Sequence, residues 1–456
     1  MPEATPTPAS AQAAVPLATI LPITASLTTD GHLALGGCDT VALAERFGTP
    51  LYVFDEDTMR QQARAFRDSF RAHYAETEVR YAAKAYINGA FARLFDEEGL
   101  GLDVVSGGEL AVALANGFPA ERIEFHGNNK TPQELAEALR AGIGRVVIDN
   151  LDEIELLEAT AARLGIRQSA MIRVGPNVDP HTHGHTTTGL LDSKFGLPIP
   201  TGQAEEGLKL AMAAPHIDLQ GIHAHLGSPI FETEPYVQAI EVMAEFLDRM
   251  WKQHGFQCQE FSPGGGFAVQ YVSETPSPEP EVYARAIGKA IKDSFGNRGL
   301  PLPHLSIEPG RSIVARAGVA LYTVGVRKEI PGVRTYVSVD GGMADNIRPA
   351  IYGSRYEAVV AARPAAPAEE TVTIAGKYCE SGDVLIKDIA LPRLKQGEVL
   401  ALPTSGAYCL AMASNYNLAL GPAVVMVKDG QARLVRRRET YEDLMRRDVL
   451  DDEAIA

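Results

Sequence analysis

A regular alternation of short apolar runs with longer amphipathic stretches fills residues 80–311, and it limits the possible folds more than any other feature. The short runs predict strands. The longer stretches, with apolar residues every three or four positions, predict helices. The predicted strands are 80–85, 101–105, 122–127, 145–150, 169–175, 219–227, 259–266 and 304–311. The helical stretches predicted between them include 88–98, 107–116, 132–141, 151–164, 235–254 and 281–295.

Eight strand–helix repeats in this span predict an α/β fold of the (β/α)8 TIM-barrel type, which typically needs about 250 residues. A doubly wound open sheet is the alternative architecture for such an alternation. The barrel reading places one large domain over residues 55–318.

The texture changes after Gly318, where runs rich in Val, Thr and Ile are separated by Gly, Pro and Asp. This pattern predicts a mostly antiparallel β domain over 319–456, with a hairpin turn at 428–430. Segments 32–37 and 51–54 also resemble strands, so residues 29–54 are expected to join that domain. Residues 1–28, rich in Ala, Pro and Thr, are predicted to form a disordered tail.

The formal charge of −16 argues against nucleic acid and anionic membranes as partners. No apolar run reaches the roughly 18 residues of a membrane span. No basic residue precedes Arg46, so the positive start of a signal peptide is missing. The cysteines show neither disulfide-scaffold nor metal-site spacing, which favours a reduced, cytoplasmic location and no metal; they are Cys38, Cys258, Cys379 and Cys409.

Polar and charged residues recur where the predicted barrel strands end, and that edge of a barrel is where active sites form. Each of these residues taken alone is also compatible with a satisfied polar group at a strand–loop junction. Their arrival at one face favours a site. They are Lys84, Asp103, His126, Arg173, His225, Gly264–Gly266 and Glu308–Arg311.

Lys84 interrupts the small, apolar run YAAKA. Loss of solvation at a barrel mouth is expected to lower the pKa of its amine and make it nucleophilic, as a Schiff-base lysine requires. A lysine extending to solvent from a strand end is the alternative.

Two glycine-bearing turns follow the last two predicted strands, SPGGG at 262–266 and EPGR at 308–311. Backbone N–H groups in such turns converge on phosphate, and barrels commonly bind phosphate at this place. A plain flexible turn explains the glycines equally well. In HAHLGS (223–228), His225 is placed near the strand end, where its ring could stack on a cofactor or serve only as a hydrogen-bonded structural histidine.

Three clusters stand out in the predicted β domain. Residues 340–353 carry Arg348 and Tyr352, and residues 405–417 carry Tyr408. Residues 377–385 carry Cys379 beside acidic neighbours, which favour a protonated thiol able to donate a proton. A small buried apolar residue is the alternative reading of this cysteine.

Together, YAAKA, HAHLGS, SPGGG, EPGR, IRPAIYG, CESGD and GAY resemble, in order and spacing, the fold-type III pyridoxal-phosphate decarboxylases. The resemblance covers about residues 30–440 and extends to the segment 173–196. It is strongest to the members that act on diaminopimelate. It implies a barrel like that of alanine racemase, carrying pyridoxal 5'-phosphate.

The resemblance also implies how the cofactor is held. Lys84 would bind it covalently, with Asp103 nearby, and His225 would stack on its ring. Glu308 would keep the pyridine nitrogen protonated, which strengthens the electron sink and favours a decarboxylase over a racemase. The phosphate and its surroundings would be contacted by Ser228, Gly264, Gly265, Gly266, Pro309, Gly310, Arg311 and Tyr408.

For the substrate, the resemblance implies that Arg311, Arg348 and Tyr352 bind a distal carboxylate. Glu380 would bind the distal ammonium, and Tyr408 would touch both cofactor and substrate. Cys379 would return a proton to the substrate carbon from a partner subunit, in a homodimer with composite sites.

The reaction so implied removes CO2 from the D-configured carbon of meso-2,6-diaminopimelate and gives L-lysine, the last step of lysine biosynthesis. A decarboxylase of ornithine or lysine is the alternative enzyme. The other alternative is a non-catalytic protein that binds pyridoxal phosphate.

Overall fold

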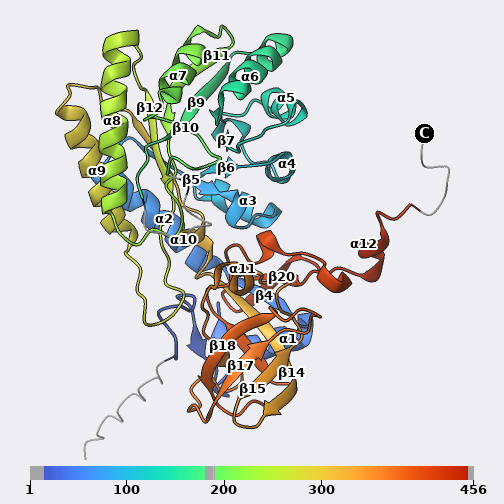
Figure 1. Ribbon diagram of the computed structural model, residues 1–456. Helices are drawn as coiled ribbons and strands as arrows, with labels where there is room; N and C mark the ends of the chain where they lie inside the picture. The colour runs from blue at the N-terminus through green and yellow to red at the C-terminus, as the bar shows by residue number, and fades with distance from the viewer. Residues whose placement is uncertain (1–14, 180–187, 189, 450–456) are drawn as a thin grey trace, which may run out of the picture.

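The computed structural model describes residues 15–179, 188 and 190–449, and it divides into a barrel and a β domain (Figure 1). The barrel has eight parallel strands, and pairing of the last strand with the first closes it, which confirms the barrel over the open sheet. In chain order the strands are β5 (Thr77–Ala82), β6 (Gly101–Val104), β7 (Ile123–Phe125), β8 (Arg145–Ile148), β9 (Gln168–Gly175), β11 (Ile217–His223), β12 (Glu260–Gly265) and β13 (His304–Glu308).

Helices surround the barrel on its outside (Figure 1). Those between strands are α3 (Gly89–Glu97), α4 (Gly107–Ala115), α5 (Pro132–Ala141), α6 (Leu151–Leu164), α7 (Gln203–Ala213), α8 (Glu234–His254) and α9 (Pro280–Gly296). Their ends follow local chemistry: Thr131 and Glu134 form a capping box at the start of α5, and left-handed Gly142 ends that helix.

The remaining place in the helix layer is filled by α2 (Glu56–His73), which precedes the first strand and packs against α9. Its buried face repeats at helical spacing through Met59, Ala63, Phe66 and Phe70. The chain leaves the barrel after β13 through the short α10 (Arg311–Val314), so no long helix follows the last strand.

The second domain is a mixed, mostly antiparallel sheet in the order β18–β17–β15–β14–β4–β20–β21, with β19 paired to β14 and β16 paired to β19. These strands are β4 (Leu51–Asp55), β14 (Gly318–Ile330), β15 (Arg334–Val339), β16 (Val359–Val360), β17 (Glu370–Ala375), β18 (Val384–Leu391), β19 (Val399–Leu402), β20 (Ala423–Lys428) and β21 (Gln431–Arg436). The pairs β4–β20 and β15–β17 are parallel. Asp429 and Gly430 have positive φ, as a tight hairpin turn between β20 and β21 requires.

The disordered tail predicted for residues 1–28 is wrong for residues 15–28, whereas 1–14 lie outside the described residues. Ile20 and Leu21 are completely buried. The Ile20 carbonyl accepts a hydrogen bond from Thr404 Oγ1 at 2.9 Å, and the Leu21 carbonyl accepts one from Arg316 Nε at 2.7 Å. The Ala/Pro/Thr composition hid these few apolar anchors. The segment ends in β1 (Ser26–Leu27), which forms a small sheet with β2 (Leu33–Leu35) and β3 (Cys38–Asp39).

Among the described residues, no helix is both long enough and apolar enough to cross a lipid bilayer.

Candidate active site

Lys84 lies just after β5 on a single 3-10 turn (Ala83–Ala85), and its ammonium faces the end of β6. Its Nζ is 2.8 Å from Oδ2 of Asp103, a fully buried carboxylate. The parallel register of β5 and β6 sets Ala82 opposite Asp103, and this brings the following turn beside the carboxylate. The first strand therefore ends before the lysine and not, as the sequence suggested, after it.

The lowered pKa expected for Lys84 is wrong. Burial acts to lower the pKa of Lys84. The electrostatic effect of Asp103, with smaller contributions from Tyr408 and Glu308, outweighs burial and raises that pKa. The free amine is thus held as an ammonium, and Asp103 is the nearest group that could receive its proton.

Glu308 ends β13 in a buried polar layer. Its Oε2 is 3.1 Å from His223 Nε2, and its Oε1 accepts a hydrogen bond of 3.1 Å from Ser262 Oγ. Burial alone would raise the pKa of Glu308, but the charges and hydrogen bond of the neighbouring histidines hold that pKa well below its usual range. An anion at this place can keep a facing ring nitrogen protonated.

His225 presents a neutral ring to the same cavity. Burial, together with the positive charges of Lys84 and Arg173, holds its pKa well below the ordinary value. The Gly265 N–H donates to His225 Nδ1 at 3.3 Å, which places the ring hydrogen on Nε2. Lys84, His225 and Glu308 line a cavity of ≈380 Å³ at the barrel mouth, together with Val105, His126, Gly127, Asn128, Arg173, Thr188, Phe195 and His223.

The three glycines are required by close backbone packing. A Cβ atom on Gly264 would lie 2.3 Å from the Ala224 carbonyl oxygen, and one on Gly266 would lie 2.2 Å from that of Gly227. Gly264 and Gly265 belong to β12, so the plain flexible turn is wrong for them.

A second cavity, of ≈390 Å³, brings together five predicted residues, namely Ser228, Arg311, Arg348, Tyr352 and Tyr408. Arg311 Nε donates to Ser228 Oγ at 3.1 Å, and its guanidinium lies 4.6 Å from the centre of the Tyr408 ring. The Tyr408 N–H donates to the Ala85 carbonyl at 2.8 Å, so this cavity adjoins the lysine turn.

Arg348 is the second cation of that cavity and is only 5% exposed. Its guanidinium stacks 4.3 Å from the centre of the Tyr271 ring and donates a hydrogen bond to Tyr356 Oη. Burial acts to lower the pKa of Arg348, but the neighbouring tyrosine and cysteine side chains outweigh it and keep the group charged. Tyr271 and Tyr356 were not predicted, because no motif marks them.

Cys379 and Glu380 line neither cavity and lie exposed between β17 and β18. The backbone of Cys379 is held on both sides, since its N–H donates to Asn417 Oδ1 at 3.0 Å and its carbonyl accepts from Tyr416 Oη at 3.2 Å. Asp383 closes the turn by accepting from the Tyr378 N–H at 2.8 Å. This turn is rigidly presented at the surface of a single chain.

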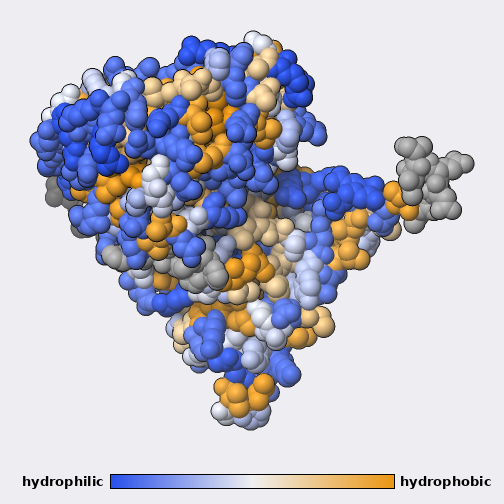
Figure 2. Space-filling view, turned by 45° about the horizontal axis from the view of Figure 1, so that its top comes forward, coloured by the Kyte–Doolittle hydropathy of each residue, from blue (hydrophilic) through white to orange (hydrophobic). Residues whose placement is uncertain are grey.

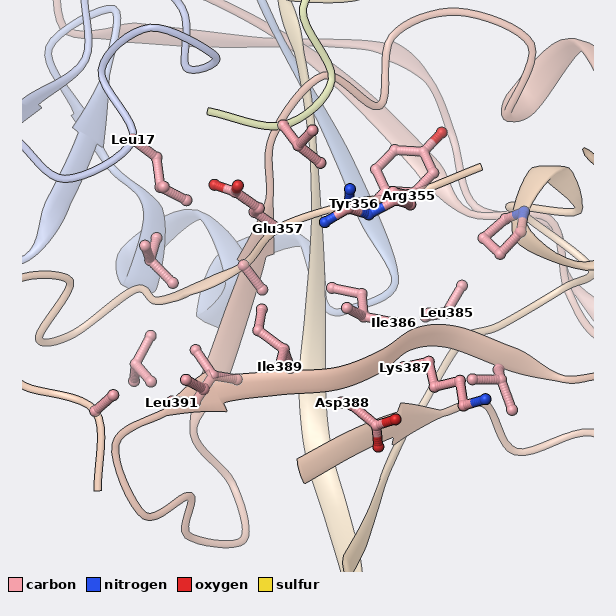
Figure 3. Close-up of a pocket in the computed structure, with 18 of the residues that line it drawn as sticks. Leu17, Arg355, Tyr356, Glu357, Leu385, Ile386, Lys387, Asp388, Ile389 and Leu391 are labelled. Carbon is pink, nitrogen blue, oxygen red and sulfur yellow. The ribbon is translucent and has the colours of Figure 1, made fainter. Parts of the chain in front are cut away.

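A third cavity, of ≈980 Å³, lies between β18 and residues 353–360 of the β domain (Figure 3). Mostly apolar side chains such as Leu17, Ile386 and Ile389 point into it (Figure 3). None of the predicted site residues lines this cavity, so its size does not mark the reactive site.

The residues at the barrel mouth fit pyridoxal phosphate. Lys84 could bond to the aldehyde of the cofactor, and the neutral ring of His225 could stack on its pyridine ring. The buried carboxylate of Glu308 could face the pyridine nitrogen. The buried atoms Asp103 Oδ1 and His223 Nδ1 have no hydrogen-bond partner, so both remain able to form a hydrogen bond at this site. Of the described residues, only His126, His223 and Glu308 are grouped closely enough for a metal, and their mutual contacts already account for that grouping.

Comparison with known proteins agrees with this geometry. Residues 56–315 match the family model described as "Pyridoxal-dependent decarboxylase, pyridoxal binding domain". The barrel is therefore that of a pyridoxal-dependent decarboxylase, a class that uses pyridoxal phosphate.

The relatives narrow this class. A diaminopimelate decarboxylase of Bacillus subtilis is 48% identical over 92% of this chain and 95% of its own length. A crystal structure of diaminopimelate decarboxylase from M. jannaschii, in complex with L-lysine, has a TM-score of 0.88 and 35% identity, and covers 94% of this chain and 98% of that one. This chain belongs to the diaminopimelate decarboxylase family. A lysine/ornithine decarboxylase of Vibrio vulnificus, at 23% identity and a TM-score of 0.72, shares the fold.

Proposed function

We propose that this enzyme uses pyridoxal phosphate to convert meso-2,6-diaminopimelate to L-lysine and CO2. The observation that carries the proposal is a cavity with two arginines, Arg311 and Arg348, next to the turn that carries Lys84. A substrate carboxylate far from the reacting carbon would find both cations there. Ornithine and lysine have no such carboxylate.

The barrel residues would hold the cofactor and prepare it. When bound, pyridoxal phosphate supplies an electron sink for the electron pair left by departing CO2. Lys84 would anchor it, with Asp103 receiving the amine proton. Anionic Glu308 would hold a proton on the ring nitrogen, and His225 would cover one face of the ring. Ser228 and the backbones of Gly264–Gly266 and Glu308–Arg311 would contact the phosphate.

The second cavity would orient the substrate by its distal end. Arginine binds a carboxylate through a planar, two-pronged fork, and stacking on Tyr271 fixes the plane of Arg348. Tyr352 would contact the same carboxylate, and Tyr408, between the two cavities, would touch both cofactor and substrate. The distal end would thereby fix which of the two amino-acid centres of diaminopimelate meets the cofactor.

Proton delivery would come from a second copy of the chain in a homodimer. Cys379 would donate its thiol proton to the carbon that lost CO2, and Glu380 would bind the distal ammonium. The proposal rests on their exposed, rigidly held turn, which lies outside both cavities of its own chain. A partner subunit that presents this turn to the cavity would complete the site.

The C-terminal arm supports a second copy independently. It leaves the body of the molecule and carries α12 (Tyr441–Met445) (Figure 1). Tyr441, Met445 and Val449 are 69%, 56% and 67% exposed at a spacing of four, and Figure 2 shows apolar residues on this arm. A helix of one turn is not stable alone in water, so a covering surface is expected.

The test is CO2 release from a substrate panel, measured with and without added pyridoxal phosphate. We expect release from meso-diaminopimelate that depends on the cofactor and is lost in Lys84→Ala. Faster release from ornithine or lysine would favour the alternative enzyme. Cofactor binding without any CO2 release would favour a non-catalytic protein.

The surroundings proposed for the reaction are a reduced cytoplasm. All four cysteines are free thiols, and three of them are buried. The proposed partners are the amino-acid substrate and a second subunit, because the charge of −16 opposes nucleic acids and anionic membranes.

A further inference from the structure

A buried histidine beneath the proposed cofactor site has no role in the mechanism above. His126 follows β7 and is 3% exposed. Its Nε2 atom lies near one carboxylate oxygen from each of three strands. The distances are 3.4 Å to Glu124 Oε2, 3.8 Å to Asp103 Oδ1 and 3.8 Å to Glu308 Oε1.

Two of these carboxylates serve opposite ends of the proposed cofactor. Asp103 pairs with Lys84 at 2.8 Å, and Glu308 is the anion proposed to contact the ring nitrogen. Asp103 accepts the hydrogen bond of Lys84 through Oδ2, and its buried Oδ1, which lies on the side of His126, has no hydrogen-bond partner. His126 is therefore the polar group placed between the two functional carboxylates.

The third carboxylate is anchored from below. Glu124 Oε2 lies 3.3 Å from Arg80 Nη1, and Arg80 also pairs with Glu78 at 2.7 Å and Glu260 at 3.0 Å. Arg80 fills the barrel interior and stays charged, because the three carboxylates together outweigh the effect of burial on its pKa. Glu124 is thus a fixed acceptor under His126.

We infer that His126 is a positioning residue: its Nε2 hydrogen-bonds Glu124 and lies at ion-pair distance from Asp103 and Glu308, so that its charge couples the lysine end of the cofactor site to the ring-nitrogen end. This inference rests on the proposed binding of pyridoxal phosphate at Lys84, but it does not depend on which amino acid is decarboxylated.

The coupling has a predictable sign. The groups facing His126 are Asp103, Glu124, Glu308 and the ring of His223, whose centre is 4.9 Å away. A donor that neutralises part of the Asp103 charge weakens the hold of Asp103 on the nitrogen of Lys84. Removing the donor should raise the pH at which the absorption band of the bound cofactor changes by half. Removing the competing Glu124 charge should lower that pH.

The experiment compares His126→Leu, His126→Gln and Glu124→Gln with the wild type, each loaded with pyridoxal phosphate. The readouts are the cofactor dissociation constant and the pH midpoint of its absorption band. For His126→Leu we expect about tenfold weaker cofactor binding and a midpoint raised by about one unit. His126→Gln keeps a donor and should stay within about threefold of the wild type. His216→Gln is the matched control, because His216 also contacts a carboxylate, Glu158 Oε1 at 2.7 Å, but lies outside the barrel-mouth cavity.

Three results would overturn the inference. One is a folded His126→Leu enzyme with an unchanged midpoint and cofactor affinity. Another is equal damage from His126→Gln and His126→Leu, since a purely space-filling histidine would not be rescued by a donor. If His126→Leu does not fold, a midpoint in Glu124→Gln that stays constant or rises contradicts the inference. If the wild type binds pyridoxal phosphate with these spectra but releases no CO2 from diaminopimelate, that result counts against the proposed function and leaves the inference on His126 standing.

Discussion

Arg348→Lys tests the assignment of the second cavity most directly. The substitution keeps a positive charge at a buried position but removes the planar fork and the stacking on Tyr271. The described hydrogen bond to Tyr356 uses only Nη1, so the guanidinium retains other N–H groups for a carboxylate. Losing one charge-assisted hydrogen bond costs about 1.5–3 kcal/mol, which corresponds to about 10- to 150-fold in affinity.

We therefore expect the KM for meso-diaminopimelate to rise about 10- to 150-fold in Arg348→Lys, with a smaller change in kcat. The assay is CO2 release over a range of substrate concentrations, alongside a thermal melt to confirm folding. Arg355→Lys is the matched control: Arg355 lines the same cavity, but its side chain is 69% exposed and pairs with Glu274. It should change KM by less than about threefold, as exposed ion pairs contribute little.

A second substrate distinguishes loss of binding to the distal carboxylate from general damage to the active site. Any slow CO2 release from lysine, which lacks that carboxylate, should change little in Arg348→Lys. A proportional loss for both substrates would refute the assignment of Arg348 to the carboxylate. An unchanged KM for diaminopimelate would refute it as well.

Three further outcomes are expected. Cys379→Ala should lower kcat by about 100-fold or more with little change in KM, because the thiol acts after substrate is bound. Steady-state kinetics measures both constants, and a raised KM with normal kcat would contradict this role. Tyr441→Ser combined with Met445→Ser should shift the protein toward monomer and lower activity in proportion, as measured by light scattering, whereas an active monomer would disprove composite sites. Burial raises the pKa of Asp345 to about 6. Its contribution to stability is therefore complete below pH about 4 and is lost as the pH rises through about 6. Melting curves should show Asp345→Asn gaining relative stability over that range, and a constant difference would contradict this.

The barrel could be predicted from the sequence because its strands are short, apolar and separated by regular helices. All eight predicted strands overlap observed strands, which end within a few residues of the predicted ends. Helix α2 was not predicted, since it precedes the first strand and falls outside the repeat on which the prediction relied. The anchors at Ile20 and Leu21 were missed because two buried residues do not alter the average composition of an Ala/Pro/Thr segment.

The site, like the fold, has features that the sequence predicts and features that it does not. Strand-end positions predicted Lys84, Asp103, His225 and Glu308 at one mouth, because parallel strands bring their ends together. The sign of the Lys84 pKa shift could not be predicted, since it depends on a 2.8 Å contact with Asp103 that only the three-dimensional register creates. A sequence can suggest that a lysine is buried, but not which charge is buried with it.

The two cavities also explain how a chain with a charge of −16 can serve an anionic cofactor and a substrate with two carboxylates. The barrel cavity holds the carboxylates Asp103 and Glu308 deep in its wall, where each faces a cation or a histidine. The adjoining cavity gathers two arginines from different domains, Arg311 after β13 and Arg348 before β16. Neither domain alone would present both cations, so the positive site exists only where the β domain meets the barrel. Lys84 and Asp103 both belong to the barrel, but the Tyr408 N–H that donates to the Ala85 carbonyl brings the β domain to the lysine turn as well. A site for the distal carboxylate at Arg311 and Arg348 would therefore require both domains.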